Sequence, residues 1–103
     1  MAIVELSVVP IGTNSTSVSE YVADIHNLLA LEQDVRFTLT PMSTVIEGEL
    51  DKLWPLLRKL HEVPFASGAQ RVYTTLKVDD RRDRKATMED KLTSVQQKQT
   101  KGA

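Results

Sequence analysis

Residues 35–49, with the sequence VRFTLTPMSTVIEGE, contain two strand-like segments joined by a very short connection. In the first segment, residues 35–40, apolar and polar side chains alternate strictly, which is the period of a half-buried strand. Pro41 and the methionine after it favour a tight turn. Residues 43–49 continue as a strand of mixed pattern, in which Gly48 indicates a bulge or the end of the strand. This stretch predicts a β-hairpin, and the elements on either side of it decide the fold.

Each side of the hairpin is predicted to carry one helix and one strand. Residues 2–10 alternate as a strand, and residues 18–32 have apolar side chains at helical spacing behind an S-x-x-E capping box that begins at Ser17. After the hairpin, Asp51 is the predicted cap of a second helix, and residues 70–79 alternate as a fourth strand. The predicted order is therefore strand, helix, two strands, helix and strand.

This order of elements predicts an α+β fold, the ferredoxin-like βαββαβ sandwich. Right-handed crossovers would give a four-stranded antiparallel sheet with the first and third strands in the middle and both main helices on one face. A weaker C-terminal helix is expected to start at Thr87. The length of 103 residues favours a single domain, here residues 1–96, and residues 97–103 are expected to fray because they have no apolar pattern.

The composition argues against several classes of function. The 13 basic and 14 acidic residues nearly cancel, so no global charge attracts nucleic acid or a membrane. No apolar run approaches a membrane span, no signal peptide is evident and there is no cysteine, so we expect a cytoplasmic protein without disulfides. The two histidines lie on different predicted helices, and the common nucleotide-binding and hydrolase motifs are missing. We therefore expect no metal, no cofactor and no enzymatic activity.

The predicted topology brings polar side chains together at one edge of the sheet. The loop at residues 11–17 is expected to lie beside the hairpin turn at residues 40–44, and the second helix ends at the same edge. The N-terminus of the first helix points there too, with free amides that favour an electronegative group. The side chains expected to converge here are Thr13, Asn14, Ser15, Ser17, Thr40, Thr44, His61 and Arg71. Neutral hydroxyls suit a polar heterocycle or a hydroxymethyl group better than a phosphate, which usually recruits lysine or arginine.

A simpler interpretation exists for each of these features. Ser17 is first of all a helix cap, and its neighbours serve turn geometry. The uncovered face of the sheet, which carries Tyr73 and Thr75, can meet solvent, a partner subunit or a ligand. The mixed-charge run at residues 79–85 is either a solvated turn or a self-complementary two-fold interface. A structural or regulatory oligomerisation module without a ligand is therefore the main alternative, and an enzyme is the least favoured hypothesis.

Four blocks of sequence, taken in order, resemble the small thiamine-binding proteins related to YkoF. These blocks are VVPIGTNSTSVSEYVA, LTPMSTVIEGEL, LHEVPFASGAQRVYTTLKVDDRRD and KLTSV, and the resemblance extends over about residues 3–95. It implies a ferredoxin-like domain that assembles as dimers and tetramers. It also implies that the protein binds thiamine or its hydroxymethylpyrimidine moiety, rather than catalysing a reaction.

The resemblance adds ligand-binding candidates on the strands. The matching blocks include the loop after the first strand, residues 44–47, and the strand around Thr75. Glu47 is a carboxylate that would favour a cationic thiazolium, and Tyr73 could stack on a flat ring, a contact worth about 1 kcal/mol. Thr44 and Glu47 point to opposite faces of one strand, so they share a pocket only if a bulge rotates that strand.

Overall fold

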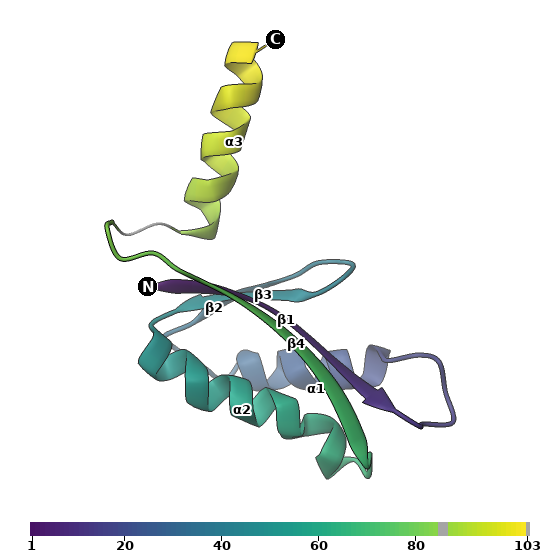
Figure 1. The fold of residues 1–103 in the computed structure, drawn as a ribbon. Helices are drawn as coiled ribbons and strands as arrows, with labels where there is room; N and C mark the ends of the chain where they lie inside the picture. The colour runs from purple at the N-terminus through teal and green to yellow at the C-terminus, as the bar shows by residue number, and fades with distance from the viewer. Residues whose placement is uncertain (85–86, 103) are drawn as a thin grey trace.

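The computed structural model describes residues 1–84 and 87–102, with the side chains of residues 1–84 and 87–99. Its elements are β1 (Ala2–Ile11), α1 (Ser19–Leu29), β2 (Arg36–Leu39), β3 (Thr44–Gly48), α2 (Leu50–Ala66), β4 (Arg71–Asp80) and α3 (Met88–Gly102). The sheet has the order β2-β3-β1-β4, its neighbouring strands are antiparallel, and α1 and α2 lie on the same side of it (Figure 1). The predicted ferredoxin-like α+β fold, with the first and third strands in the middle, is confirmed.

The hydrophobic core lies between the sheet and the two helices. Alternate residues of β1 from Ala2 to Val8 are buried, and Ile46 of β3 beside them is fully buried. On α2, Leu53 and Leu60 are seven residues apart and therefore lie on one face of the helix, and neither is exposed. This burial on one side of each element positions α1 and α2 against the sheet.

Neither predicted side-chain cap is formed. α1 begins at Ser19 with Val18 at the N-cap position, and the Ser17 hydroxyl hydrogen-bonds to Ser19 Oγ at 3.0 Å. Local hydroxyl contacts of this kind compete with capping, which is why the S-x-x-E pattern failed here. α2 begins at Leu50, so Asp51 lies inside the first turn, where its charge still favours the helix dipole.

α3 extends away from the sheet and the other two helices (Figure 1). The radius of gyration is accordingly 15.6 Å, whereas a compact chain of this length would have about 13 Å. Residues 97–102, which were expected to fray, continue α3 in the structure, and Ala103 lies outside the described residues. The glutamines and lysines there are good helix formers, so an exposed helix needs no apolar stripe. None of the helices in the described ranges is long and apolar enough to cross a membrane.

Replacing Leu53 by alanine should lower the free energy of unfolding by about 2–5 kcal/mol, because the side chain is fully buried and its removal leaves a cavity. The matched control is Leu31→Ala, since Leu31 is 77% exposed, and its effect should be smaller than about 0.5 kcal/mol. Urea denaturation followed by circular dichroism measures both variants. Equal losses of stability in the two variants would contradict this assignment of the core.

Candidate ligand-binding site

A recess of about 700 Å³ lies between α1, β1 and the turn that joins β2 to β3. β1 pairs with β3 only as far as Leu6, opposite Thr44, but it pairs with β4 as far as Ile11. The end of β1 therefore has a neighbouring strand on one side only, and the start of α1 and the hairpin turn enclose the other side. The volume is typical of small-molecule sites, which occupy about 300–1,000 Å³. The lining residues are Leu6, Ser7, Val8, Val9, Ser17, Val18, Ser19, Val22, Ala23, Ile25, His26, Leu39, Thr40, Pro41, Met42, Ser43 and Thr44.

The lining of this recess is apolar with a few neutral polar groups. It includes serine and threonine residues from β1, the start of α1 and the hairpin, and one histidine, His26. Among the described residues, no aspartate, glutamate, lysine or arginine lines it. Residues 1–84 and 87–102 also contain no group of three or more histidine, aspartate or glutamate side chains that could hold a metal ion. The arrangement can accept an uncharged, polar ring-sized molecule.

The hydroxyls of the recess differ in how fully their hydrogen bonds are used. Thr40 Oγ1 accepts hydrogen bonds from Met42 N at 3.3 Å and Ser43 N at 3.0 Å, and it donates to Ser43 O at 2.9 Å. A hydroxyl has one donor and two acceptor sites, so Thr40 is fully used in holding the turn. Thr44 Oγ1 bonds to the His26 side chain at 3.0 Å, and Ser17 bonds to Ser19, so each keeps hydrogen-bonding capacity for a ligand.

His26 is a residue of the recess that the sequence analysis did not select. Its Nε2 lies 3.0 Å from Thr44 Oγ1, and its ring meets Phe37 edge to face at a centroid distance of 5.4 Å. Burial lowers the pKa of His26 below its ordinary value of 6.5. The signal in the sequence was its position four residues after Val22, on the same face of α1.

The predicted convergence of polar side chains holds for only three of them: Ser17, Thr40 and Thr44 line the recess. The others lie in separate places. Thr13 and Ser15 line a smaller depression, where the Thr13 hydroxyl donates to Ser15 O at 2.8 Å. Asn14 lines the same depression as Thr13 and Ser15. Arg71 lines a different depression, which Thr13 also lines. His61 hydrogen-bonds to Thr74 Oγ1 at 2.6 Å.

The predicted strand candidates lie on the other face of the sheet. In the ladder, Tyr73 is opposite Val9 and Thr75 is opposite Ser7, and Tyr73 is 62% exposed. These residues alternate with the buried positions of their strands and therefore face away from α1 and α2. We call this side the outer face of the sheet. Within a single chain, Tyr73 and Thr75 do not line the recess.

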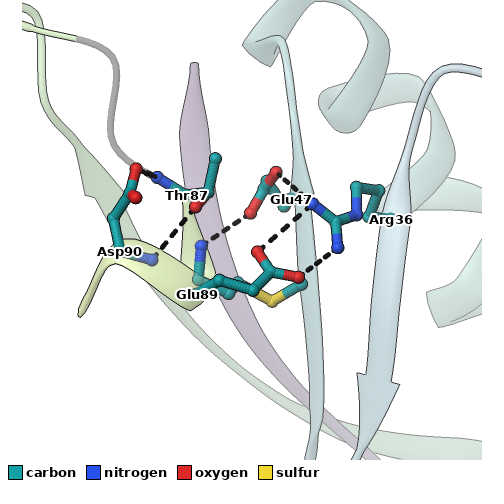
Figure 2. Close-up of polar contacts among 6 residues, drawn as sticks. Arg36, Glu47, Thr87, Glu89 and Asp90 are labelled. Carbon is teal, nitrogen blue, oxygen red and sulfur yellow. Dashed lines mark hydrogen bonds and ion pairs between the residues drawn. The ribbon is translucent and has the colours of Figure 1, made fainter. Parts of the chain in front are cut away.

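Glu47, predicted to contact a thiazolium, binds the start of α3 instead (Figure 2). Its side chain is only 2% exposed, and Oε2 accepts a hydrogen bond from Met88 N at 2.7 Å. Arg36 Nη1 lies 3.9 Å from Oε1, and Arg36 Nη2 forms an ion pair with Glu89. β3 pairs continuously with β1 through Gly48. With no bulge to rotate the strand, Glu47 stays on the outer face, away from the recess.

α3 has the reciprocal cap that was predicted for α1 (Figure 2). Asp90 N donates to Thr87 Oγ1 at 3.1 Å, and Thr87 N donates to Asp90 Oδ2 at 2.9 Å. This is the geometry of a capping box, with aspartate in the place of glutamate. Together with Glu47, it satisfies the Met88 and Asp90 amides in the first turn of α3 and fixes the point at which the helix leaves the sheet.

Two arginine–aspartate pairs form within the mixed-charge run, and its Asp79 pairs with Lys91 of α3. Arg81 Nε donates to Asp83 Oδ1 at 2.5 Å, and Arg82 Nη2 donates to Asp80 Oδ2 at 2.7 Å. The hydrogen bond from Arg81 lowers the pKa of Asp83 to about 2. These local pairs favour the interpretation as a solvated turn, and the two-fold interface stays a prediction. Lys85, the last residue of the run, lies outside the described residues.

The chain belongs to the thiamine-binding protein family, whose model matches residues 4–96. It is 47% identical over 98 residues to the UPF0045 protein YqgV of Bacillus subtilis, covering 92% of this chain and 94% of YqgV. A UPF0045 protein of Methanothermobacter thermautotrophicus is 44% identical over 99 residues, with coverage of 95% and 99%. These relatives match almost the full length of the chain.

Solved structures agree with the fold. Protein MJ1052 of Methanocaldococcus jannaschii superposes with a TM-score of 0.80 at 31% identity, covering 91% of this chain and 94% of MJ1052. A Thermotoga maritima protein, proposed to act in thiamine biosynthesis or salvage, has a TM-score of 0.75 at 19% identity, with coverage of 91% and 97%. The second likeness supports the architecture alone.

Replacing Glu47 by alanine should loosen the start of α3, because the partly buried Met88 amide loses its acceptor at a cost of about 1–3 kcal/mol. Hydrogen exchange followed by mass spectrometry should show faster exchange at residues 88–92. The control is Glu49→Ala, since Glu49 is 62% exposed and contacts the N-terminal amine at 3.4 Å. Unchanged exchange in Glu47→Ala would show that this contact does not hold the helix.

The stability of the fold should depend on the protonation of His26. The unfolded chain keeps the ordinary pKa of 6.5, whereas burial lowers the pKa of His26 in the folded chain. Between these values the unfolded chain binds more protons, so the free energy of unfolding should decrease as the pH falls below about 6.5. Urea denaturation at about pH 7.5 and about pH 5.5 should show this loss in the wild type and a smaller one in His26→Gln. Equal losses of stability in the wild type and in His26→Gln would contradict the assignment of this pH dependence to His26.

Proposed function

We propose that the protein binds thiamine, or its hydroxymethylpyrimidine moiety, in the recess between α1 and the β2–β3 turn. The observation that carries this proposal is the composition of the lining, which combines hydroxyls and one imidazole with apolar side chains and contains no charged carboxylate or amine in the described residues. Membership of the thiamine-binding protein family supports thiamine as the proposed ligand. The proposed direct contacts are Ser17 and Thr44, and Thr40 holds the turn around them.

The pyrimidine half of thiamine fits this chemistry better than the thiazolium half. An aminopyrimidine offers hydrogen-bond donors and acceptors at its edge, which hydroxyls and a neutral imidazole can match. The positive end of the α1 dipole also lies at the recess, which Val18 and Ser19 at the start of the helix line, and it favours an electronegative atom over a cation. The carboxylate expected to favour the cation, Glu47, lies on the outer face. In this proposal the thiazolium stays at the opening of the recess.

We propose binding without catalysis. General acid–base catalysis usually combines ionisable groups held within reach of the reacting atoms, and His26 is the one histidine of the recess. The absence of cysteine fits the proposed cytoplasmic location. The absence of catalysis and the cytoplasmic location are therefore parts of the proposed function.

We also propose that the protein acts as a dimer or tetramer. Two surfaces with exposed apolar side chains support self-association: the outer face, with Tyr73 62% exposed, and α3, whose Leu92 and Val95 are 63% and 55% exposed. In such an assembly Tyr73 and Thr75 would belong to a subunit contact, and a ligand contribution from them would come from a second chain. The residues Thr13 and Ser15 would act at the rim, through the loop that precedes α1.

Isothermal titration calorimetry of the wild type with thiamine and with hydroxymethylpyrimidine should show saturable binding. Thr44→Val should weaken it by about tenfold, because the isosteric change removes one hydrogen bond inside the recess. Thr38→Val is the matched control, since Thr38 is an exposed residue of β2 on the outer face. A third variant, Thr75→Val, tests whether the outer face contributes to ligand binding. Folded wild-type protein that gives no heat with either compound would refute the proposal.

The alternative is a structural or regulatory oligomerisation module without a ligand. The exposed apolar side chains of α3 and the outer face favour it, because Tyr73, Leu92 and Val95 do not line the recess. Native mass spectrometry of protein taken directly from cells separates the two functions. A retained small molecule supports the binding protein, whereas defined oligomers without one support the module.

A further inference from the structure

His26 is held in the wall of the recess by contacts from two strands. Its Nε2 lies 3.0 Å from Thr44 Oγ1 of β3, and its ring meets Phe37 of β2 edge to face at an interplanar angle of 73°. The two contacts leave the imidazole little freedom to swing into solvent. In the described structure the second ring nitrogen, Nδ1, makes no hydrogen bond to the protein, so it keeps a donor or acceptor site for another molecule.

Among the described residues, His26 is the only ionisable side chain in the recess. The other ionisable residues of the surrounding elements are Glu5 of β1, Glu20, Tyr21 and Asp24 of α1, Arg36 of β2 and Glu47 of β3. Those of the strands lie on the outer face, where Glu5 pairs with Lys77 and Glu47 with Arg36. Glu20 and Tyr21 line the separate depression beside Thr13. Burial is the cause of the lowered pKa of His26.

The neutral imidazole has a direct consequence for which molecules can bind. A molecule that fills the recess displaces water from His26, and a partly buried imidazolium without that water is costly. An uncharged ligand therefore binds better to the neutral form of His26. A cationic group would be repelled by the protonated form, whereas an anion would be attracted to it. Binding and protonation are thus coupled, and the sign of the coupling depends on the charge of the ligand.

We propose that His26, bonded to Thr44, is a specificity-determining residue that favours an uncharged nitrogen heterocycle in the recess while its imidazole is neutral. This inference rests on the proposed function, since the ligand in question is the pyrimidine half of thiamine. Protonation of His26 opposes the binding of this ligand. The second histidine, His61, has a similar pair of contacts, with Thr74 and Phe65, but it does not line the recess.

The test is calorimetric titration with hydroxymethylpyrimidine between about pH 7.5 and about pH 5.5. In the wild type the dissociation constant should rise below the pKa of His26, by at most about tenfold for each pH unit. His26→Gln keeps a polar side chain that can reach Thr44 but cannot titrate, so its dissociation constant should change less over the same range. His61→Gln is the matched control and should follow the wild type. Any protonation of the ligand itself is common to all three proteins and cancels in the comparison.

The outcomes separate this inference from the proposed function. If the folded wild type gives no heat with hydroxymethylpyrimidine or thiamine at about pH 7.5, both fail. If it binds but His26→Gln keeps the wild-type pH dependence, or His61→Gln loses it, this inference alone is overturned. Should His26→Gln fail to fold, nuclear magnetic resonance of the wild type decides. The pKa of the His26 ring must fall when hydroxymethylpyrimidine binds, and an unchanged value refutes the proposal.

Discussion

The extent of strand pairing along β1 is the constraint on which the rest of the structure depends. Its pairing with β3 stops where Leu6 meets Thr44, but its pairing with β4 continues to Ile11. The short hairpin between the two helices therefore turns back before β1 ends. The unpaired edge at the end of β1 faces the start of α1 and the hairpin turn, and the recess is the space between them. A longer β3 would extend the ladder and fill this space with paired backbone.

The two histidines illustrate how position in the fold separates chemically equal residues. Each imidazole bonds to a threonine hydroxyl and meets a phenylalanine ring edge to face. His26 on α1 packs toward the short side of the sheet and lines the recess, whereas His61 on α2 packs against β4. Local sequence does not distinguish them, because the difference comes from which strands lie opposite each helix.

Glu47, which the sequence analysis assigned to ligand binding, instead caps the first turn of α3. A carboxylate on the outer face of a central region of the sheet would be costly to bury alone. The Met88 amide and the Arg36 guanidinium compensate its burial, and Thr87 and Asp90 complete the cap (Figure 2). The residue that appeared suited to a cationic ligand therefore has an internal partner 41 positions later in the chain.

The sequence by itself determined the order of the elements and the faces of the strands, because hydrophobic periodicity is a local property that burial enforces. It identified the recess edge through Ser17, Thr40 and Thr44, since the antiparallel order places these segments together. It misplaced the caps of α1 and α2, where neighbouring hydroxyls and a two-residue shift of the α2 cap position, from Asp51 to Glu49, changed the local hydrogen bonds. Only the tertiary structure decided that Thr44 meets His26 while Glu47 meets α3. Both pairings join residues distant in sequence, and their geometry depends on strand length and helix packing, which no local pattern specifies.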